Sequence, residues 1–236
     1  MERARQFERL VQEILRKRHF VNHGCALLVG ISGIDGSGKS TLAPQLAARL
    51  NSLGPKTELI ELDDWHNPPA LRFNPARPAS TFYESGLRHD ELFSTLVLPL
   101  RNKRSVFMET TISRQPDERP FRHTFHYEDV DIVILEGIFI FKQQYQHHFD
   151  FRCWVECPFD VALERALRRN QEGLSQQSLI HAYETIYFPA QRLHFAADRP
   201  FDGVDFVFHN ADDDAQLTDS QDAPRPSLSG SVQCNG

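Results

Sequence analysis

The chain has 236 residues, of which 40% are hydrophobic and 25% are charged, and its formal net charge is −6. This composition is ordinary for a soluble globular protein of one large or two small domains with a sizeable core. The acidic balance argues against a general nucleic-acid-binding surface, and no apolar run approaches the length of a membrane span. We therefore expect neither nucleic acid nor a membrane among its partners.

The four cysteines indicate a reducing compartment. Cys25, Cys153, Cys157 and Cys234 form no C-x-x-C pair, so buried thiols are a better interpretation than a metal site. The first twenty residues are charged throughout and lack the apolar segment of a secretory signal. Together these features predict a cytoplasmic protein.

The N-terminal third begins with an expected helix and continues into a glycine-rich turn. Residues 3–18 carry apolar side chains on one helical face, which predicts an amphipathic helix (within residues 1–20) that packs on its own domain. The apolar run Cys25–Ser32 predicts a strand, and the spacing in Ser40–Leu50 predicts a helix. Between them lies "GIDGSGKST", Gly33–Thr41.

This stretch contains the complete G-x-x-x-x-G-K-[ST] pattern in the strand–turn–helix context that the pattern needs. Glycines let the backbone approach an anion closely, and the turned amides with the helix N-terminus form a phosphate pocket. Lys39 would reach the β- and γ-phosphates, and the Ser40 hydroxyl would hold Mg²⁺. The expected nucleotide-binding residues are Gly33, Asp35, Gly36, Ser37, Gly38, Lys39, Ser40 and Thr41.

A second strand is predicted at Lys56–Trp65, and it ends in two carboxylates, Asp63 and Asp64. Ligands of open α/β sheets bind beyond the carboxyl ends of the strands, so this pair lies where chemistry is expected. Asp63 is the preferred candidate for the base that accepts the proton of an acceptor hydroxyl, and Asp64 is the alternative.

The middle of the chain is less regular. The proline-rich stretch His66–Ser80 predicts a long surface loop, and a helix that ends near Pro99–Asn102 should follow. Ser105–Ile112 is compatible with a strand, and Arg114–Tyr127 with a loop and a short strand.

The most apolar run, Val130–Phe141, predicts a buried strand that ends at Glu136-Gly137. Such a strand can lie beside the one that leads into the glycine turn. Glu136 would then hold Mg²⁺ directly or through water; the alternative is a glutamate that only caps a turn.

Four further elements and a tail complete the chain. Phe149–Pro158 predicts a strand, Phe159–Gly173 a helix stopped by its glycine, and Ser175–His194 a helix that is interrupted or ends near Pro189. Val204–Asn210 predicts a last short strand. Residues 211–236 are acidic and then rich in Ser, Pro and Gly, and we expect them to be disordered, which leaves residues 1–210 as the folded domain.

The helix that starts at Phe159 carries three arginines. Arg165 and Arg169 share a helical face, and Arg165 also neighbours Arg168. Such residues can clamp phosphate oxygens as charge develops, although a solvated basic helix end would look the same in isolation.

Strands that alternate with helices predict a mostly parallel, three-layer α/β fold. Within it, "GIDGSGKST", "ELDDW", "VILEGIF", "ERALRRN" and "YFPAQRLH" resemble, in this order, the uridine kinase and phosphoribulokinase family of P-loop kinases. The resemblance covers residues 25–210. It implies a P-loop NTPase fold with a helical lid, to which this chain adds its N-terminal helix.

The resemblance also implies site residues and cofactors. ATP and Mg²⁺ would be the cofactors, with Ser40 and Glu136 at the metal. Asp63 matches the aspartate that deprotonates the acceptor, and Arg165 and Arg169 match the lid arginines. Tyr83 or Glu84 lies near the ribose-binding carboxylate of the family. The segment Met108–Phe121 departs from the family, since it lacks the Tyr-Asp-Phe and following His that read the pyrimidine.

These features predict a kinase that phosphorylates a hydroxyl of a small molecule such as the nucleoside uridine. A nucleoside monophosphate kinase is a second possibility, but its Arg-Glu-Pro and Asp-Arg-Tyr segments are missing. A nucleotide-gated switch is a third, but Asn102-Lys103 is not followed by the aspartate that such proteins use. The sequence leaves the oligomeric state open, a homo-oligomer included.

Overall fold

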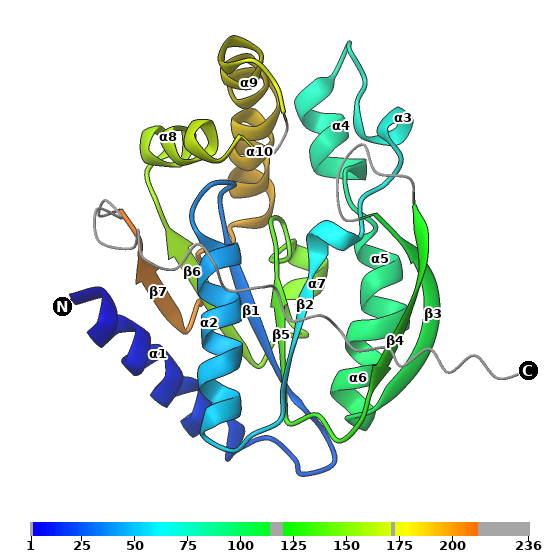
Figure 1. Ribbon diagram of the computed structural model, residues 1–236, viewed down its shortest axis with the longest axis vertical. Coiled ribbons are helices and arrows are strands. Elements are labelled where there is room, and N and C mark those ends of the chain that lie inside the picture. Colours follow the sequence, from blue (N-terminus) through cyan, green and yellow to red (C-terminus); the bar gives the residue numbers. More distant parts are fainter. Residues whose placement is uncertain (1, 114–119, 171–172, 212–236) are drawn as a thin grey trace, which may run out of the picture.

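A sheet of parallel strands forms the centre of the molecule (Figure 1). The computed structural model describes residues 2–113, 120–170 and 173–211. The strand order of the sheet is β2-β5-β1-β6-β7, with all neighbours parallel. The five strands are β1 (Leu27–Gly33), β2 (Thr57–Glu61), β5 (Ile132–Glu136), β6 (Phe151–Glu156) and β7 (Phe206–His209). Each falls within a residue of a predicted strand, so the expected parallel sheet is confirmed.

Two helices cover one face of the sheet: α1 (Glu2–Arg18) and α2 (Lys39–Ser52). The apolar stripe of α1, Leu10, Val11 and Ile14, is fully buried in the cluster that α2 and the sheet share. The amphipathic N-terminal helix therefore packs on its own domain, as its sequence predicts.

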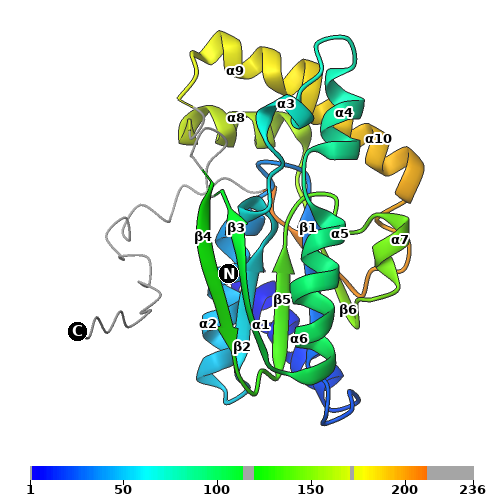
Figure 2. The same cartoon turned by 90° about the vertical axis from the view of Figure 1, so that its right-hand side faces the viewer.

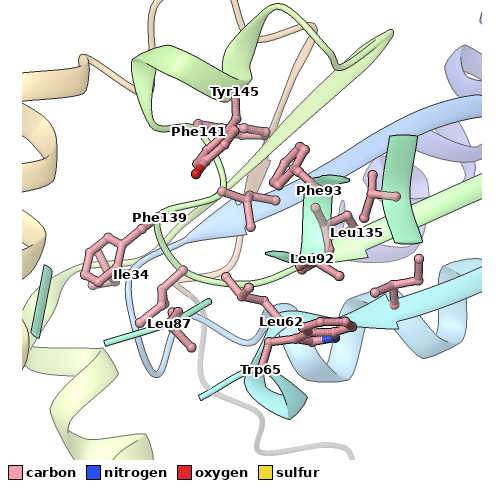
Figure 3. Close-up of a cluster of buried hydrophobic side chains, with 14 of the residues drawn as sticks. Ile34, Leu62, Trp65, Leu87, Leu92, Phe93, Leu135, Phe139, Phe141 and Tyr145 are labelled. Atoms are coloured by element: carbon pink, nitrogen blue, oxygen red, sulfur yellow. The ribbon is translucent and has the colours of Figure 1, made fainter. Parts of the chain in front are cut away.

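A long helix covers the other face and completes the three layers. It consists of α5 (His89–Leu92), a wider π-helical turn η2 (Phe93–Val97) and α6 (Leu98–Lys103). Figure 3 shows Leu92 and Phe93 of this helix beside Leu135 of β5 in the apolar cluster. Because β1 and β5 are buried along their whole length, both faces of the sheet are covered.

The helix predicted over Ser175–His194 does not end near Pro189 but is interrupted just before it by a wider turn. The chain stays helical through α9 (Gln176–Ala182), the π-helical turn η3 (Tyr183–Tyr187) and α10 (Phe188–Asp198). Pro189 is the second residue after the wide turn, as Pro99 is after η2. A proline has no amide hydrogen to donate, and in a regular α-helix its ring clashes with the carbonyl group four residues earlier. In a π-helical turn the hydrogen bonds span five residues, so this carbonyl group lies farther from the proline ring.

The helix before it, α8 (Phe159–Arg169), also ends earlier than predicted. Asn170 adopts the left-handed conformation, with φ of 40°, and its amide bonds to Ala166. Asparagine tolerates this conformation better than most residues, so it replaces the predicted stop at Gly173. α8 and α9 lie beyond the carboxyl ends of the strands (Figure 1), where a lid is expected.

A two-stranded antiparallel hairpin, β3 (Val106–Ile112) and β4 (Phe121–Tyr127), stands apart from the parallel sheet. It runs beside α5 and α6 in Figure 1, and Figure 2 shows its two strands side by side. Its inner face reaches the core through Phe125, whose ring lies 6.0 Å from that of Trp65. The strands that were ambiguous in the sequence thus pair with each other.

The predicted loop His66–Ser80 is wrong in part. Two short helices, α3 (Pro69–Arg72) and α4 (Pro78–Ser85), begin in it, each with a proline in its first turn. The first amides of a helix have no hydrogen-bond partner within the helix, so a proline, which has no amide hydrogen, loses no bond at this position. The prolines therefore start helices instead of preventing them. The remaining short elements are η1 (Leu62–Asp64) and α7 (Gln143–Gln146).

Within the described ranges, no helix has the length and apolarity that a membrane crossing requires. Cys153 and Cys157 are buried thiols, as expected, and Cys25 is half-buried. Cys234 and the predicted disordered tail lie outside the described residues, except for Ala211.

Candidate active site

The glycine-rich turn joins β1 to α2 and depends on its glycines. Gly36 and Gly38 have φ of +77° and +94°, a conformation that other residues rarely adopt. A Cβ on Gly36 would lie 2.5 Å from the carbonyl oxygen of Ala162, and one on Gly38 would lie 2.3 Å from Nδ2 of Asn210. The loop is therefore enclosed by α8 on one side and by the end of β7 on the other.

Asn210, the residue after β7, is hydrogen-bonded to the loop. Its side-chain Nδ2 donates to the carbonyl oxygen of Ser37 at 2.7 Å, and its backbone amide donates to the carbonyl oxygen of Glu156 at the end of β6. Lys39 opens α2 and is buried, with its Nζ 2.9 Å from the carbonyl oxygen of Ile34. The lysine ammonium thus lies across the concave side of the loop, where phosphate would bind.

A pocket of about 480 Å³ opens on this loop. It brings together residues from six segments of the chain: α1, the loop with the start of α2, η1, the end of β5 with the residues that follow it, α8, and the residue after β7. The lining residues are Arg3, Asp35, Gly36, Gly38, Lys39, Ser40, Thr41, Asp63, Glu136, Ile138, Arg165, Ala166, Arg168, Arg169 and Asn210. Gly33 and Ser37 belong to the loop but do not line the pocket.

Ser40 and Glu136 meet within this pocket. The Ser40 hydroxyl donates to Oε1 of Glu136 at 3.4 Å. Glu136 ends β5 and is only 2% exposed, and burial raises the pKa of its carboxyl to about 8 against the attraction of Lys39. A buried carboxylate of this kind is stabilised in its charged form by a cation.

The pair fits Mg²⁺ in particular. Mg²⁺ is held by one or two protein oxygens, with water and substrate phosphates completing its coordination. Among the described residues, no group of three or more His, Cys, Asp or Glu side chains could hold a metal alone. A hydroxyl and one carboxylate beside a phosphate loop agree with a metal that is bound together with nucleotide.

Asp63 lies in η1, directly after β2, and it lines the pocket, whereas Asp64 does not. The side chain of Asp63 is exposed, while Asp64 is half-buried and its carbonyl oxygen accepts from the amide of Ser113. The order of the strands explains why Asp63 and Glu136 converge, since β2 and β5 are neighbours and Glu61 pairs with Glu136. This placement agrees with the preference for Asp63 over Asp64.

The arginines of α8 face the loop. Nη1 of Arg165 lies 3.5 Å from the carbonyl oxygen of Ser37, and Arg169 lies 4.0 Å from Asp35. Arg168 lines the pocket as well. Asp35 also accepts a hydrogen bond from the hydroxyl of Tyr183 in the lid. The lid is thus connected to the loop through side chains that carry charge.

Tyr83 and Glu84 are not among the pocket-lining residues. Both are on α4, where the Tyr83 hydroxyl bonds to Asp198 and its ring packs 5.4 Å from that of Phe139. Glu84 is exposed. Their predicted part in substrate binding stays a prediction.

Four pocket residues had no place in the sequence-based site: Arg3, Ile138, Ala166 and Asn210. Asn210 follows the last strand, so the rule that ligands bind at carboxyl strand ends could have found it. No local signal marks Arg3, which looks like any cation on the polar face of an amphipathic helix.

No protein-family model matches the chain. It is similar to the uridine kinase of Lactobacillus helveticus, with 26% identity over 169 residues that cover 66% of this chain and 74% of that protein. The predicted resemblance to uridine kinases is therefore confirmed.

Solved structures show the same fold. A possible uridine kinase from Bacillus stearothermophilus superposes with a TM-score of 0.69 and 22% identity, over 88% of this chain and all 100% of that one. A putative fructose transport system kinase from Silicibacter sp. has a TM-score of 0.68 and 22% identity, over 85% and 98% of the two chains. The predicted α/β fold of the P-loop kinases is confirmed.

Proposed function

We propose that residues 1–210 form a cytoplasmic ATP- and Mg²⁺-dependent kinase domain that transfers the γ-phosphate to a hydroxyl of a small molecule. One observation carries this proposal: Lys39, Asp63 and Glu136 line a single pocket on the phosphate loop. A nucleotide-binding switch needs the loop and one strand-end carboxylate for the metal, a place that Glu136 can fill. Asp63 is a second carboxylate in the same pocket, and a kinase uses such a group as the base for its acceptor hydroxyl.

The loop amides and Lys39 would bind the β- and γ-phosphates of ATP. Ser40 and Glu136 would hold Mg²⁺, which when bound neutralises phosphate charge. Asp63 would accept the proton of the acceptor hydroxyl while that oxygen forms a bond to the γ-phosphorus. The bond from the γ-phosphorus to its bridging oxygen breaks, and ADP leaves with that oxygen.

The arginines of α8 would stabilise the negative charge on the phosphoryl group while it is transferred. Arg165 and Arg169 are already directed at the loop through Ser37 and Asp35. Positioned cations of this kind account for much of the catalysis of phosphoryl transfer, because the reaction is dominated by positioning and charge neutralisation.

We propose a nucleoside such as uridine as the first acceptor to test, because the similar curated protein is named a uridine kinase. Sugars are the second class, since a structural neighbour is named a putative fructose transport system kinase. Because Met108–Phe121 lacks the pyrimidine-reading residues of uridine kinases, acceptors other than nucleosides belong in the test. Of the two ribose-binding candidates, Glu84 is exposed, whereas the Tyr83 hydroxyl is engaged by Asp198.

The test is a coupled assay of ADP release across a panel of nucleosides, sugars and hydroxy acids with Mg·ATP. We expect one acceptor class to raise ADP release well above the rate without acceptor, with a phosphorylated product detectable by mass. ATP binding without stimulation by any acceptor would overturn the assignment as a kinase.

A further inference from the structure

The helix α1 contributes a cation to the pocket. Arg3, in its first turn, lines the same space as Lys39 and Glu136. The other pocket arginines, Arg165, Arg168 and Arg169, all come from α8. Arg3 therefore brings positive charge from a separate element, one that packs against β7 and α2.

Several contacts set the position of this first turn. Oε1 of Gln6 accepts a hydrogen bond from the amide of His209 at 2.9 Å. The guanidinium of Arg9 lies 5.7 Å from the ring centre of Phe206, and Glu8 pairs with Arg49 of α2. Residues 3 and 6 are neighbours on one side of a helix, so the contact of Gln6 with β7 also places Arg3.

The same contact leads to the phosphate loop. Asn210 directly follows His209, and its side chain bonds to Ser37 of the loop. One continuous wall of the pocket is thus formed by the first turn of α1, the end of β7 and the loop. Its polar residues that belong neither to the loop nor to α8 are Arg3 and Asn210.

The order of the strands indicates which part of the bound donor nucleotide would contact this wall. β1, which carries the loop, is the third of five strands; β2, which carries Asp63, is two positions to one side, and β7 is two positions to the other. Strands lie about 4.8 Å apart, so Asp63 and the wall are each displaced about 10 Å from the loop in opposite directions.

Phosphoryl transfer requires the attacking and leaving oxygens to lie roughly in line, on opposite sides of the phosphorus. If Asp63 marks the side of the acceptor, the nucleoside of the donor must extend toward β6 and β7. Arg3 and Asn210 are the polar groups that it meets there. A guanidinium suits this place because it stacks on the face of an aromatic base.

We propose that Arg3 binds the nucleoside half of the donor nucleotide, so that α1 is part of the nucleotide site. This inference rests on the proposed function, since it takes ATP as the donor and Asp63 as the acceptor side. Arg3 contacts no reacting atom in this assignment and contributes binding alone, which lowers KM for ATP without raising kcat.

Calorimetric titration of the full chain with Mg·ATP and with inorganic tripolyphosphate tests the assignment. Arg3→Ala is expected to weaken ATP binding about fivefold to twentyfold, the range of a desolvated cation–aromatic contact, and to change tripolyphosphate binding less than twofold. Arg5→Ala is the matched control, because Arg5 carries the same charge on the same helix but is exposed and does not line the pocket. It should bind both probes like wild type.

Two results would overturn the proposal. ATP binding within twofold of wild type in Arg3→Ala would remove Arg3 from the site. Equal weakening of ATP and tripolyphosphate would make it a phosphate ligand instead of a nucleoside ligand. Circular dichroism of the variant reports whether α1 is retained. Failure of the proposed function looks different, since it appears in wild type as ATP binding without acceptor-stimulated ADP release.

Discussion

The hydroxyl of Ser40 and the carboxylate of Glu136 meet at 3.4 Å, although they are 96 residues apart in the chain. The second residue of α2 and the last residue of β5 are brought together because β1 and β5 are parallel neighbours. We propose this pair as the protein ligands of Mg²⁺, and the first prediction concerns it.

Glu136→Gln should lower kcat about 100-fold and raise the Mg²⁺ concentration needed for half-maximal rate, because a neutral amide compensates the metal charge poorly. The measurement is ADP release as a function of Mg²⁺ at saturating ATP. Glu156→Gln is the control, since Glu156 ends β6, which lies on the far side of β1 from β5, and does not line the pocket. An unchanged Mg²⁺ dependence in Glu136→Gln would place the metal elsewhere.

Asp63→Asn should reduce transfer by 10²- to 10⁴-fold, the usual contribution of a general base, while the affinity for ATP stays within about twofold. Rate and ATP binding are measured separately, by product formation and by calorimetry. Asp64→Asn serves as the matched variant and should retain most of its activity, because that side chain does not line the pocket. The reverse pattern in the two variants would make Asp64 the base.

Gly38→Ala should lower the affinity for ATP at least about tenfold, since its Cβ would meet Asn210 Nδ2 at 2.3 Å in a left-handed conformation. Gly54→Ala isolates the effect of conformation: Gly54 has φ of +116°, but a Cβ there would meet no atom within 4 Å. Gly54→Ala should therefore lower thermal stability and leave ATP binding intact. Normal ATP binding by Gly38→Ala would mean that the loop can rearrange around a side chain.

His89 should make the fold sensitive to acid. It is buried and stacks on Tyr145, and burial lowers its pKa to about 3, with Lys142 and His194 opposing its charge further. Between pH 6.5 and 3 the unfolded chain then binds more protons at this residue than the folded chain does, so stability falls as the pH falls.

The measurement is the free energy of unfolding by urea between pH 7 and 5. His89→Gln should reduce the slope by up to about 1.4 kcal/mol per pH unit below pH 6.5, the limit for one proton. His126→Gln, which removes an exposed histidine of β4, should leave the slope as in wild type. A slope that is equal in wild type and His89→Gln would show that other groups cause the acid sensitivity.

The parts that were predictable from sequence are those where a local pattern determines the structure. The apolar runs before Gly33 and Glu136 form buried parallel strands, and their carboxyl ends place the loop, Asp63 and Glu136 on one pocket. Arg3 was not predictable, because its place depends on how α1 lies against β7, through contacts such as that of Gln6 with His209. Such contacts leave no periodic signal in the sequence.

Helix boundaries failed for a related reason. Pro189 signals an end, yet the helix continues because the preceding turn is wide, and Asn170 ends α8 before the more obvious glycine. In both cases one strong local signal was overridden by backbone geometry in the residues next to it.

The wide turn before Pro99 has a consequence for the phase of its helix. The buried residues Leu92, Leu96 and Leu100 recur every four residues, and at 100° per residue a regular helix would rotate each about 40° past the one before. The turn at Phe93–Val97 winds more loosely and takes up this drift. All three side chains therefore stay buried on one face of the helix. Loss of one residue from this turn would let it close as a regular helix in which Leu92 and Leu100 are seven residues apart, only about 20° out of line.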